Sequence, residues 1–282
     1  MNNFYLSVFL LSILSCPVQG QDTLWVNSGD WFQSADTMQV LRFNETTAFD
    51  TSNAALSIPE FQGWELTVVN GDEVDHDLFI GGLDSPIGQI PAGETTTLQM
   101  PGLEMGTYRY YSSDERGMVM GLSGLIKVGF DADIQFHWNI ADWMPSMVDS
   151  AAALAPVDWD SDYVPEYFSI NSRSYPNTIN DTNAHIELSL GDTCTISITN
   201  SGMMDHVFHF HGFHILWISS TVQTSRVGWT KDTVPMHKGE GITLQLVASQ
   251  LGMYPVHNHN LIAVTNAGFY PGGMITMINV TP

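Results

Sequence analysis

The sequence predicts an all-β protein made of two tandem β-sandwiches. Glycine, asparagine, aspartate and proline recur roughly every ten residues and separate short β-branched runs, such as those at 65–70, 195–198 and 242–247. Short strands at this spacing are typical of sandwiches and barrels rather than of alternating strands and helices. Long amphipathic helical windows are scarce, and only the segment 142–160 is expected to hold a short helix.

A weak internal repeat predicts the two halves. Each half has the same order: a strand that ends in asparagine, a histidine-containing strand, a strand with the pattern Gly-x-Tyr, and a closing strand. The asparagines are Asn70 and Asn200, and the first histidines that follow them are His76 and His206. We therefore expect a signal peptide at 1–20, a first domain at 21–130, a connector at 131–160 and a second domain at 161–282.

Charge and hydropathy exclude several functions. The 282 residues include 30 acidic and 8 basic side chains, for a formal net charge of −22, which repels nucleic acid and anionic membranes and attracts cations. After the N-terminal region no apolar run reaches the roughly 18 residues that a transmembrane helix needs. We expect no nucleic-acid partner and no transmembrane segment.

The N-terminus resembles a secretory signal. An apolar run at 4–17 is followed by Val18-Gln19-Gly20, which predicts cleavage near Gly20 and a secreted or periplasmic protein, although the first residues carry no lysine or arginine. Acylation at Cys16, which would make a lipid anchor, is the alternative. Cleavage would leave a single cysteine, Cys194, in phase with buried strand positions, so we expect it to be a buried thiol with no disulfide.

Two histidine clusters in the second half predict a metal site. The first is His206-Val-Phe-His209-Phe-His211, and the second is His257-Asn258-His259. Because side chains in a strand alternate between faces, each His-x-His pair shares one face, and two such pairs on neighbouring strands would bring four imidazoles together. Imidazole suits copper best among divalent ions, with zinc as the second choice. One or two ions would fit this ligand set.

The same motifs resemble those of multicopper oxidases. The segment 206–212 is similar to the H-P-F-H-L-H-G motif of that family, and 252–259 with Gly273-Met274 is similar to its G-x-W-x-x-H-C-H … G-M ending. Asp232-Thr-Val234 and Gly239-Glu240 resemble a further D-T-V … P-G-E stretch. The resemblance implies two cupredoxin-like Greek-key domains. It also implies type 2 copper ligation by His209, type 3 ligation by His211, His257 and His259, and a type 1 role for His206, which is the less certain ligand.

The sequence departs from the family at the remaining type 1 positions. Asn258 stands where cysteine is expected, and Ala263 stands where a histidine is expected. A type 1 centre depends on a copper–thiolate bond that an amide cannot replace, so we expect none here. In the first half, the two histidine pairs of the family fall on 79–82 and 111–113, which contain no histidine. A homotrimer, expected from two-domain relatives, could not restore these pairs because every copy is the same.

Three functions remain open. The first is a secreted copper-dependent oxidoreductase that acts on a small-molecule or metal-ion substrate without a type 1 copper; no catalytic residue is assigned. The second is a non-enzymatic periplasmic protein for copper binding, storage or delivery. The third is a metal-free scaffold. Methionines at 118, 120, 144, 147, 203 and 204 are candidate copper(I) ligands, because thioether is a soft ligand, although methionine also fills irregular cores.

Overall fold

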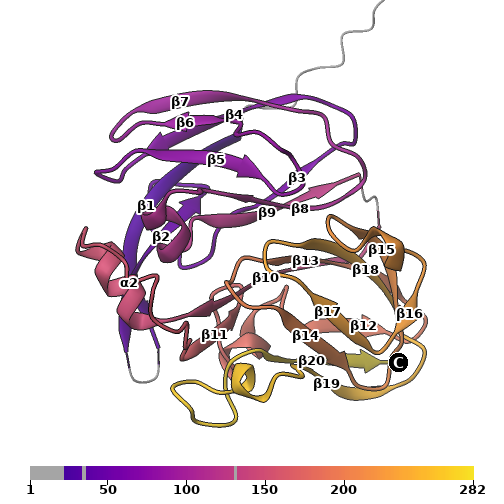
Figure 1. Ribbon diagram of the computed structural model, residues 1–282. Helices are drawn as coiled ribbons and strands as arrows, with labels where there is room; N and C mark the ends of the chain where they lie inside the picture. The colour runs from indigo at the N-terminus through magenta and orange to yellow at the C-terminus, as the bar shows by residue number, and fades with distance from the viewer. Residues whose placement is uncertain (1–21, 34–35, 130–131) are drawn as a thin grey trace, which may run out of the picture.

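The computed structural model describes residues 22–33, 36–129 and 132–282, and the predicted signal peptide with Cys16 lies outside them. Two sheets form the first half of the chain, and both are drawn in indigo to magenta in Figure 1. The four-stranded sheet contains, in spatial order, β2 (Thr37–Asn44), β1 (Asp22–Phe32), β4 (Trp64–Asn70) and β7 (Thr95–Met100). The five-stranded sheet contains β3 (Ala55–Ile58), β9 (Ser123–Val128), β8 (Gly106–Tyr111), β5 (His76–Ile80) and β6 (Gly88–Ile90).

Two further sheets form the second half. The six-stranded sheet contains β11 (Tyr167–Ile170), β10 (Gln135–Trp143), β13 (Thr193–Asn200), β18 (Gly241–Val247), β15 (Ile215–Ser220) and β16 (Thr230–Lys231). The five-stranded sheet contains β12 (Ile186–Ser189), β20 (Ile275–Thr281), β19 (Gly252–Asn258), β14 (His206–Phe210) and β17 (Thr233–Met236). The prediction of an all-β protein is therefore confirmed.

Helices are short and lie between strands. The segment 142–160, expected to hold a helix, contains α2 (Pro145–Ala152), and α1 (Glu115–Met120) was not expected. Asp114 caps α1 by accepting a hydrogen bond from the Gly117 N–H at 2.8 Å. Three 3₁₀ turns complete the described part of the chain: η1 (Asn177–Asn180), η2 (Thr224–Arg226) and η3 (Leu261–Val264).

Glycine is required where α1 ends. Gly121 has φ 91°, and a Cβ there would lie 2.4 Å from the Trp143 ring and 2.6 Å from the Arg42 guanidinium. Any larger residue would be strained in this left-handed backbone conformation, and its Cβ would clash with these two side chains.

Two hydrophobic cores underlie the two halves. The first is built around Val40, Phe43 and Val68, and the second around Trp138, Phe208 and Phe210. Cys194 is fully buried in the second core, as its position in phase with neighbouring apolar residues predicts, and it forms no disulfide with any described residue. No described helix is long and apolar enough to cross a membrane.

The two halves contact each other through polar groups as well as apolar ones. Strand β10, in the segment 131–160, pairs in parallel with β13 and antiparallel to β11 in the second half. Across the junction the hydroxyl groups of Thr107 and Thr243 lie 2.7 Å apart, and the Trp31 indole donates to the Ser172 carbonyl at 2.7 Å. The junction is therefore an ordered interface, and the exact domain boundaries stay a prediction.

Candidate metal centre

The histidine cluster, comprising His209, His211, His257 and His259, lies on the outer face of the second five-stranded sheet. His209 and His257 are direct register partners on the antiparallel strands β14 and β19. Alternation places Phe208 and Val256 in the core and the two histidines on the opposite face, where they are half-buried. The ring centroids of neighbouring members lie 4.5 to 6.2 Å apart.

Two members of the cluster face each other directly. Nε2 of His211 lies 3.1 Å from Nε2 of His257, and Nδ1 of His257 lies 3.0 Å from the backbone carbonyl oxygen of Asn258. Because a carbonyl only accepts, Nδ1 of His257 carries the proton, and the lone pair on its Nε2 faces Nε2 of His211. This is the tautomer that a metal-binding imidazole needs, with its other nitrogen anchored.

The electrostatics of the cluster favour a neutral ring at His211. Burial and the neighbouring His209, His257 and His259 lower the pKa of His211 below its ordinary value. A neutral imidazole at neutral pH is the ligating form, so metal binding need not displace a proton held by a charged ring.

The donor set fits copper or zinc, but the ligands are not fully converged. Two bonds of about 2.0–2.1 Å from nitrogen to an ion can span the 3.1 Å between the two Nε2 atoms. In the described part of the chain, however, no three histidine, cysteine, aspartate or glutamate side chains form a group arranged to hold an ion. The cluster therefore presents one aligned pair, with His209 and His259 beside it.

The positions that the resemblance assigns to a type 1 centre are occupied by a hydrogen-bonded polar network. The Asn258 amide donates to Nδ1 of His206 at 2.9 Å and to the Met274 sulfur at 3.4 Å. The side-chain oxygen of Asn258, Oδ1, accepts a hydrogen bond from the Asn260 N–H at 2.9 Å. His206, Asn258, Met274 and Ala263 are all fully buried. The side-chain amide thus joins the two side chains that would otherwise ligate a metal here.

Asp142 completes this network from β10. It accepts a hydrogen bond from Nε2 of His206 at 2.8 Å, so both ring nitrogens of His206 are engaged. It also accepts from the Tyr163 hydroxyl and from the backbone N–H groups of Met203 and Met204. Burial raises the pKa of Asp142, but the hydrogen bonds from His206, Tyr163 and the Met203 N–H outweigh it and bring the pKa below its ordinary value. Sequence reasoning missed Asp142 because no motif surrounds it.

The first half has a different network around His76. Nδ1 of His76 lies 2.8 Å from Asp114 and Nε2 lies 3.1 Å from Asp72, which Arg116 also contacts at 2.7 Å. The Ser112 hydroxyl donates a further hydrogen bond to Asp114. Burial lowers the pKa of His76, but Asp114 and Asp72 outweigh it and raise the pKa to about 9. His76 is therefore an imidazolium held between two carboxylates, which leaves no lone pair for a metal.

The His76 network predicts a stability that falls in mild alkali. Because the folded pKa of about 9 exceeds the ordinary 6.5, its contribution is complete below about pH 6.5 and is lost as pH rises through 9. Asp72 and Asp114 have lowered pKa values, so their contribution is lost in acid instead. We expect the free energy of unfolding to fall by roughly 1–3 kcal/mol between pH 6.5 and 9. Urea denaturation at several pH values measures this free energy. Its decrease with pH should become smaller in His76→Gln. A wild-type protein whose free energy of unfolding does not fall over this pH range would contradict the charged state assigned to His76.

Comparisons with known proteins agree with this architecture. The multicopper oxidase family model matches residues 157–272. A blue copper oxidase from Nitrosomonas europaea is 19% identical with a TM-score of 0.77, covering 92% of this chain and 85% of that one. The multicopper oxidase mgLAC is 20% identical with a TM-score of 0.73, covering 92% and 84%. A copper nitrite reductase from Nitrosomonas europaea is 16% identical with a TM-score of 0.70, covering 93% and 94%.

No curated protein sequence matches the chain. At these identities the solved structures establish the fold, and they confirm the cupredoxin-like prediction over both halves. Residues 157–272 therefore match the multicopper oxidase family model, and the chain has, over most of its length, the two-domain cupredoxin-type fold seen in multicopper oxidases and copper nitrite reductases.

Proposed function

We propose that the protein is a secreted copper-binding protein of the multicopper-oxidase type that holds copper through His209, His211, His257 and His259. The observation that carries this proposal is the facing pair of His211 and His257, with Nε2 atoms 3.1 Å apart and the His257 tautomer fixed by the Asn258 carbonyl. His206 is not part of the proposed ligand set because both of its ring nitrogens are hydrogen bonded to protein groups.

The proposed activity is a copper-dependent oxidoreduction that bypasses a type 1 centre. Bound copper supplies one-electron redox chemistry. The backbone carbonyl of Asn258 orients His257. Because His259 is exposed, a small molecule or metal ion can reach the cluster from solvent. The Asn258 amide ties His206 to Met274, which supports direct transfer between substrate and the histidine cluster rather than through a separate electron-entry site.

Copper storage or delivery without turnover is the second candidate. It is favoured by the incomplete convergence of the four histidines, since no three described side chains are fixed in a ligating group. Such a site would exchange its ion more readily than a preorganised cage.

We expect a homotrimer only because two-domain relatives of this type form trimers. The first half would face a neighbouring copy with Phe79 and Tyr111 at the positions of the family's histidine pairs. These two rings stack with centroids 5.7 Å apart, and Arg109 lies over Tyr111 at 4.3 Å. A neighbouring copy would therefore add no imidazole from these positions, and the histidine cluster would have to bind copper with its own four rings.

Copper loading followed by gel filtration and metal analysis tests the proposal, with turnover measured as oxygen or nitrite consumption in the presence of a small electron donor. We expect one or two retained copper ions per chain, and a gain in unfolding free energy of about 4 kcal/mol at free copper 1,000 times Kd. Turnover that disappears in His257→Ala supports the oxidoreductase, and reversible binding without turnover supports storage. No retained copper and no stabilisation would contradict both.

A further inference from the structure

A polar cavity lies between the two halves of the chain. Its inner part has a volume of about 140 Å³ and adjoins a wider mouth of about 370 Å³. Residues 52–55 of the first half line both parts, and His137 on β10 lines both parts from the second half. None of the described residues that line the cavity belongs to the histidine cluster.

Strand alternation explains why β10 presents polar side chains to this cavity. Phe136, Trp138 and Ile140 are buried in the second core, so His137 and Asn139 lie on the opposite face of the strand. Figure 1 shows β10 on the side of the second half that faces the first half. The polar lining therefore follows from the sequence of β10 itself.

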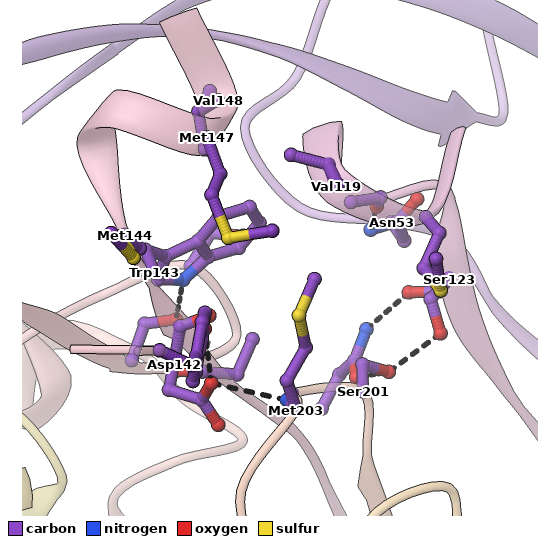
Figure 2. Close-up of a pocket in the computed structure, with 18 residues that line it drawn as sticks. Asn53, Val119, Ser123, Asp142, Trp143, Met144, Met147, Val148, Ser201 and Met203 are labelled. Carbon is purple, nitrogen blue, oxygen red and sulfur yellow. Dashed lines mark hydrogen bonds between the residues drawn. The ribbon is translucent and has the colours of Figure 1, made fainter. Parts of the chain in front are cut away.

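Hydrogen bonds between the halves hold the walls of the cavity in place. The Ser52 hydroxyl donates to the backbone carbonyl of Asn171 at 2.9 Å, and the Asn139 amide donates to the backbone carbonyl of Ser123 at 2.5 Å. The hydroxyl groups of Ser123 and Ser201 lie 2.6 Å apart, and Figure 2 shows this contact beside an adjoining pocket. A cavity whose walls are already fixed loses little side-chain freedom when a ligand enters.

Three polar side chains on the inner lining have no hydrogen-bond partner within the described part of the chain. They are the ring of His137, the hydroxyl of Ser172 and the amide of Asn183, and all three are only partly buried. Burial and the charge of Lys127 lower the pKa of His137 to about 4, so its ring is neutral at neutral pH. Each of the three side chains can therefore both donate and accept a hydrogen bond.

The charges of the lining disfavour an anion. On the inner lining, the one carboxylate among the described residues is that of Asp181, which accepts a hydrogen bond from Nε of Arg173 at 3.2 Å. Glu45 and Asp50 are exposed at the mouth, and the whole chain has a formal charge of −22. An approaching anion is repelled, while the inner part holds no unpaired charge that would require a cation.

The lining favours a ligand rich in hydroxyl groups. An aromatic or aliphatic molecule has little to pack against, because the apolar residues described on the inner lining are Ala54, Ala55 and Leu125. In a polar cavity, ordered water is displaced without loss of affinity only by groups that reproduce its hydrogen bonds. A hydroxyl group does so, since it donates and accepts as water does.

We propose that this cavity binds a neutral polyhydroxylated molecule of monosaccharide size, with hydroxyl groups hydrogen bonded to His137, Ser172 and Asn183. The volume of the mouth lies at the lower end of the roughly 300–1,000 Å³ of small-molecule sites, which suits one sugar ring rather than a chain. The site uses no metal and no member of the histidine cluster, so it does not depend on the proposed copper function.

Titration of the full chain with D-glucose and with myo-inositol tests the proposal. Calorimetry measures Kd, and NMR of protein with ¹³C-labelled histidine rings shows whether the ligand lies at His137. D-glucuronate and D-glucosamine are matched compounds that add one negative or one positive charge to glucose. We expect saturable binding of glucose or inositol with a shift of the His137 ring signals, and roughly tenfold weaker binding of glucuronate.

Variants of one lining residue locate the site. His137→Leu removes both ring nitrogens and should weaken binding about tenfold, whereas His137→Gln keeps a donor and an acceptor and should retain most of the affinity. His214→Ala, at an exposed histidine outside the cavity, is the matched control and should bind as the wild type does. An unchanged Kd in His257→Ala would separate this result from copper binding.

Three results would overturn the proposal. They are no saturable binding of either polyol, wild-type affinity in His137→Leu, and binding of glucosamine more than tenfold tighter than that of glucose, which would identify the ligand as a cation. If His137→Leu does not fold, Asn183→Ala, at a partly buried turn position, replaces it, and wild-type affinity in that variant would overturn the proposal equally.

Discussion

Replacing Asp142 by alanine is expected to lower the free energy of unfolding by about 3–5 kcal/mol, because it breaks a buried network by removing one partner. The carboxylate accepts from His206, from Tyr163 and from the backbone N–H groups of Met203 and Met204. Its loss leaves the buried Nε2–H of His206 and three part-buried donors without this acceptor, and a buried donor without an acceptor costs about 1–3 kcal/mol in isolation. Urea denaturation at neutral pH measures the change.

Asp149→Ala is the matched control, since that aspartate is exposed on α2, the helix that follows β10. We expect it to change the free energy of unfolding by no more than about 0.5 kcal/mol. Asp142→Asn should give an intermediate loss, because the amide oxygen can still accept one or two of the four hydrogen bonds. An Asp142→Ala variant as stable as Asp149→Ala would show that the network does not hold the second half together.

Replacing His211 by alanine is expected to weaken copper binding by roughly 100-fold or more, because it removes one of the two aligned nitrogen donors. Changes in groups that merely orient a ligand cost about 10- to 100-fold, so removal of a ligand should cost at least as much. Competition with a copper chelator of known affinity measures Kd for the wild type and the variant. His211 is only partly buried, so the fold should tolerate the change.

His214→Ala provides the control from the same sequence motif. His214 is exposed, and it has no ring contact with the histidine cluster. We expect an unchanged Kd for that variant. Equal weakening in both variants would mean that copper binds nonspecifically to surface imidazoles.

The repeat in the sequence predicted a repeat of local structure. Asn70 and Asn200 end equivalent strands, and each side chain donates to the carbonyl four residues later at 2.9 Å, that of Val74 or Met204. Each also accepts from the backbone N–H two residues later. Both turns aim the following histidine, His76 or His206, into the interior. A short motif of this kind can be found in sequence because these two hydrogen bonds join residues that are two and four positions apart.

The partners of these histidines could not be predicted in the same way. Asp142 lies 64 residues before His206, and Asp114 lies 38 residues after His76, so only the tertiary fold brings them together. Strand alternation predicted that the members of each His-x-His pair share a face, whereas the direct pairing of His209 with His257 depends on β14 and β19 being neighbours.

The absorption and electron paramagnetic resonance spectra of the copper-loaded wild-type protein test the central claim most directly. Ligation by imidazoles without a thiolate predicts bound copper with no intense blue band. One ion would give a normal copper(II) resonance, and a coupled pair would give a largely silent one. An intense blue band would contradict the account by requiring a thiolate ligand. Equal failure of the wild type and His211→Ala to retain copper would contradict it by showing that the histidine cluster holds no metal.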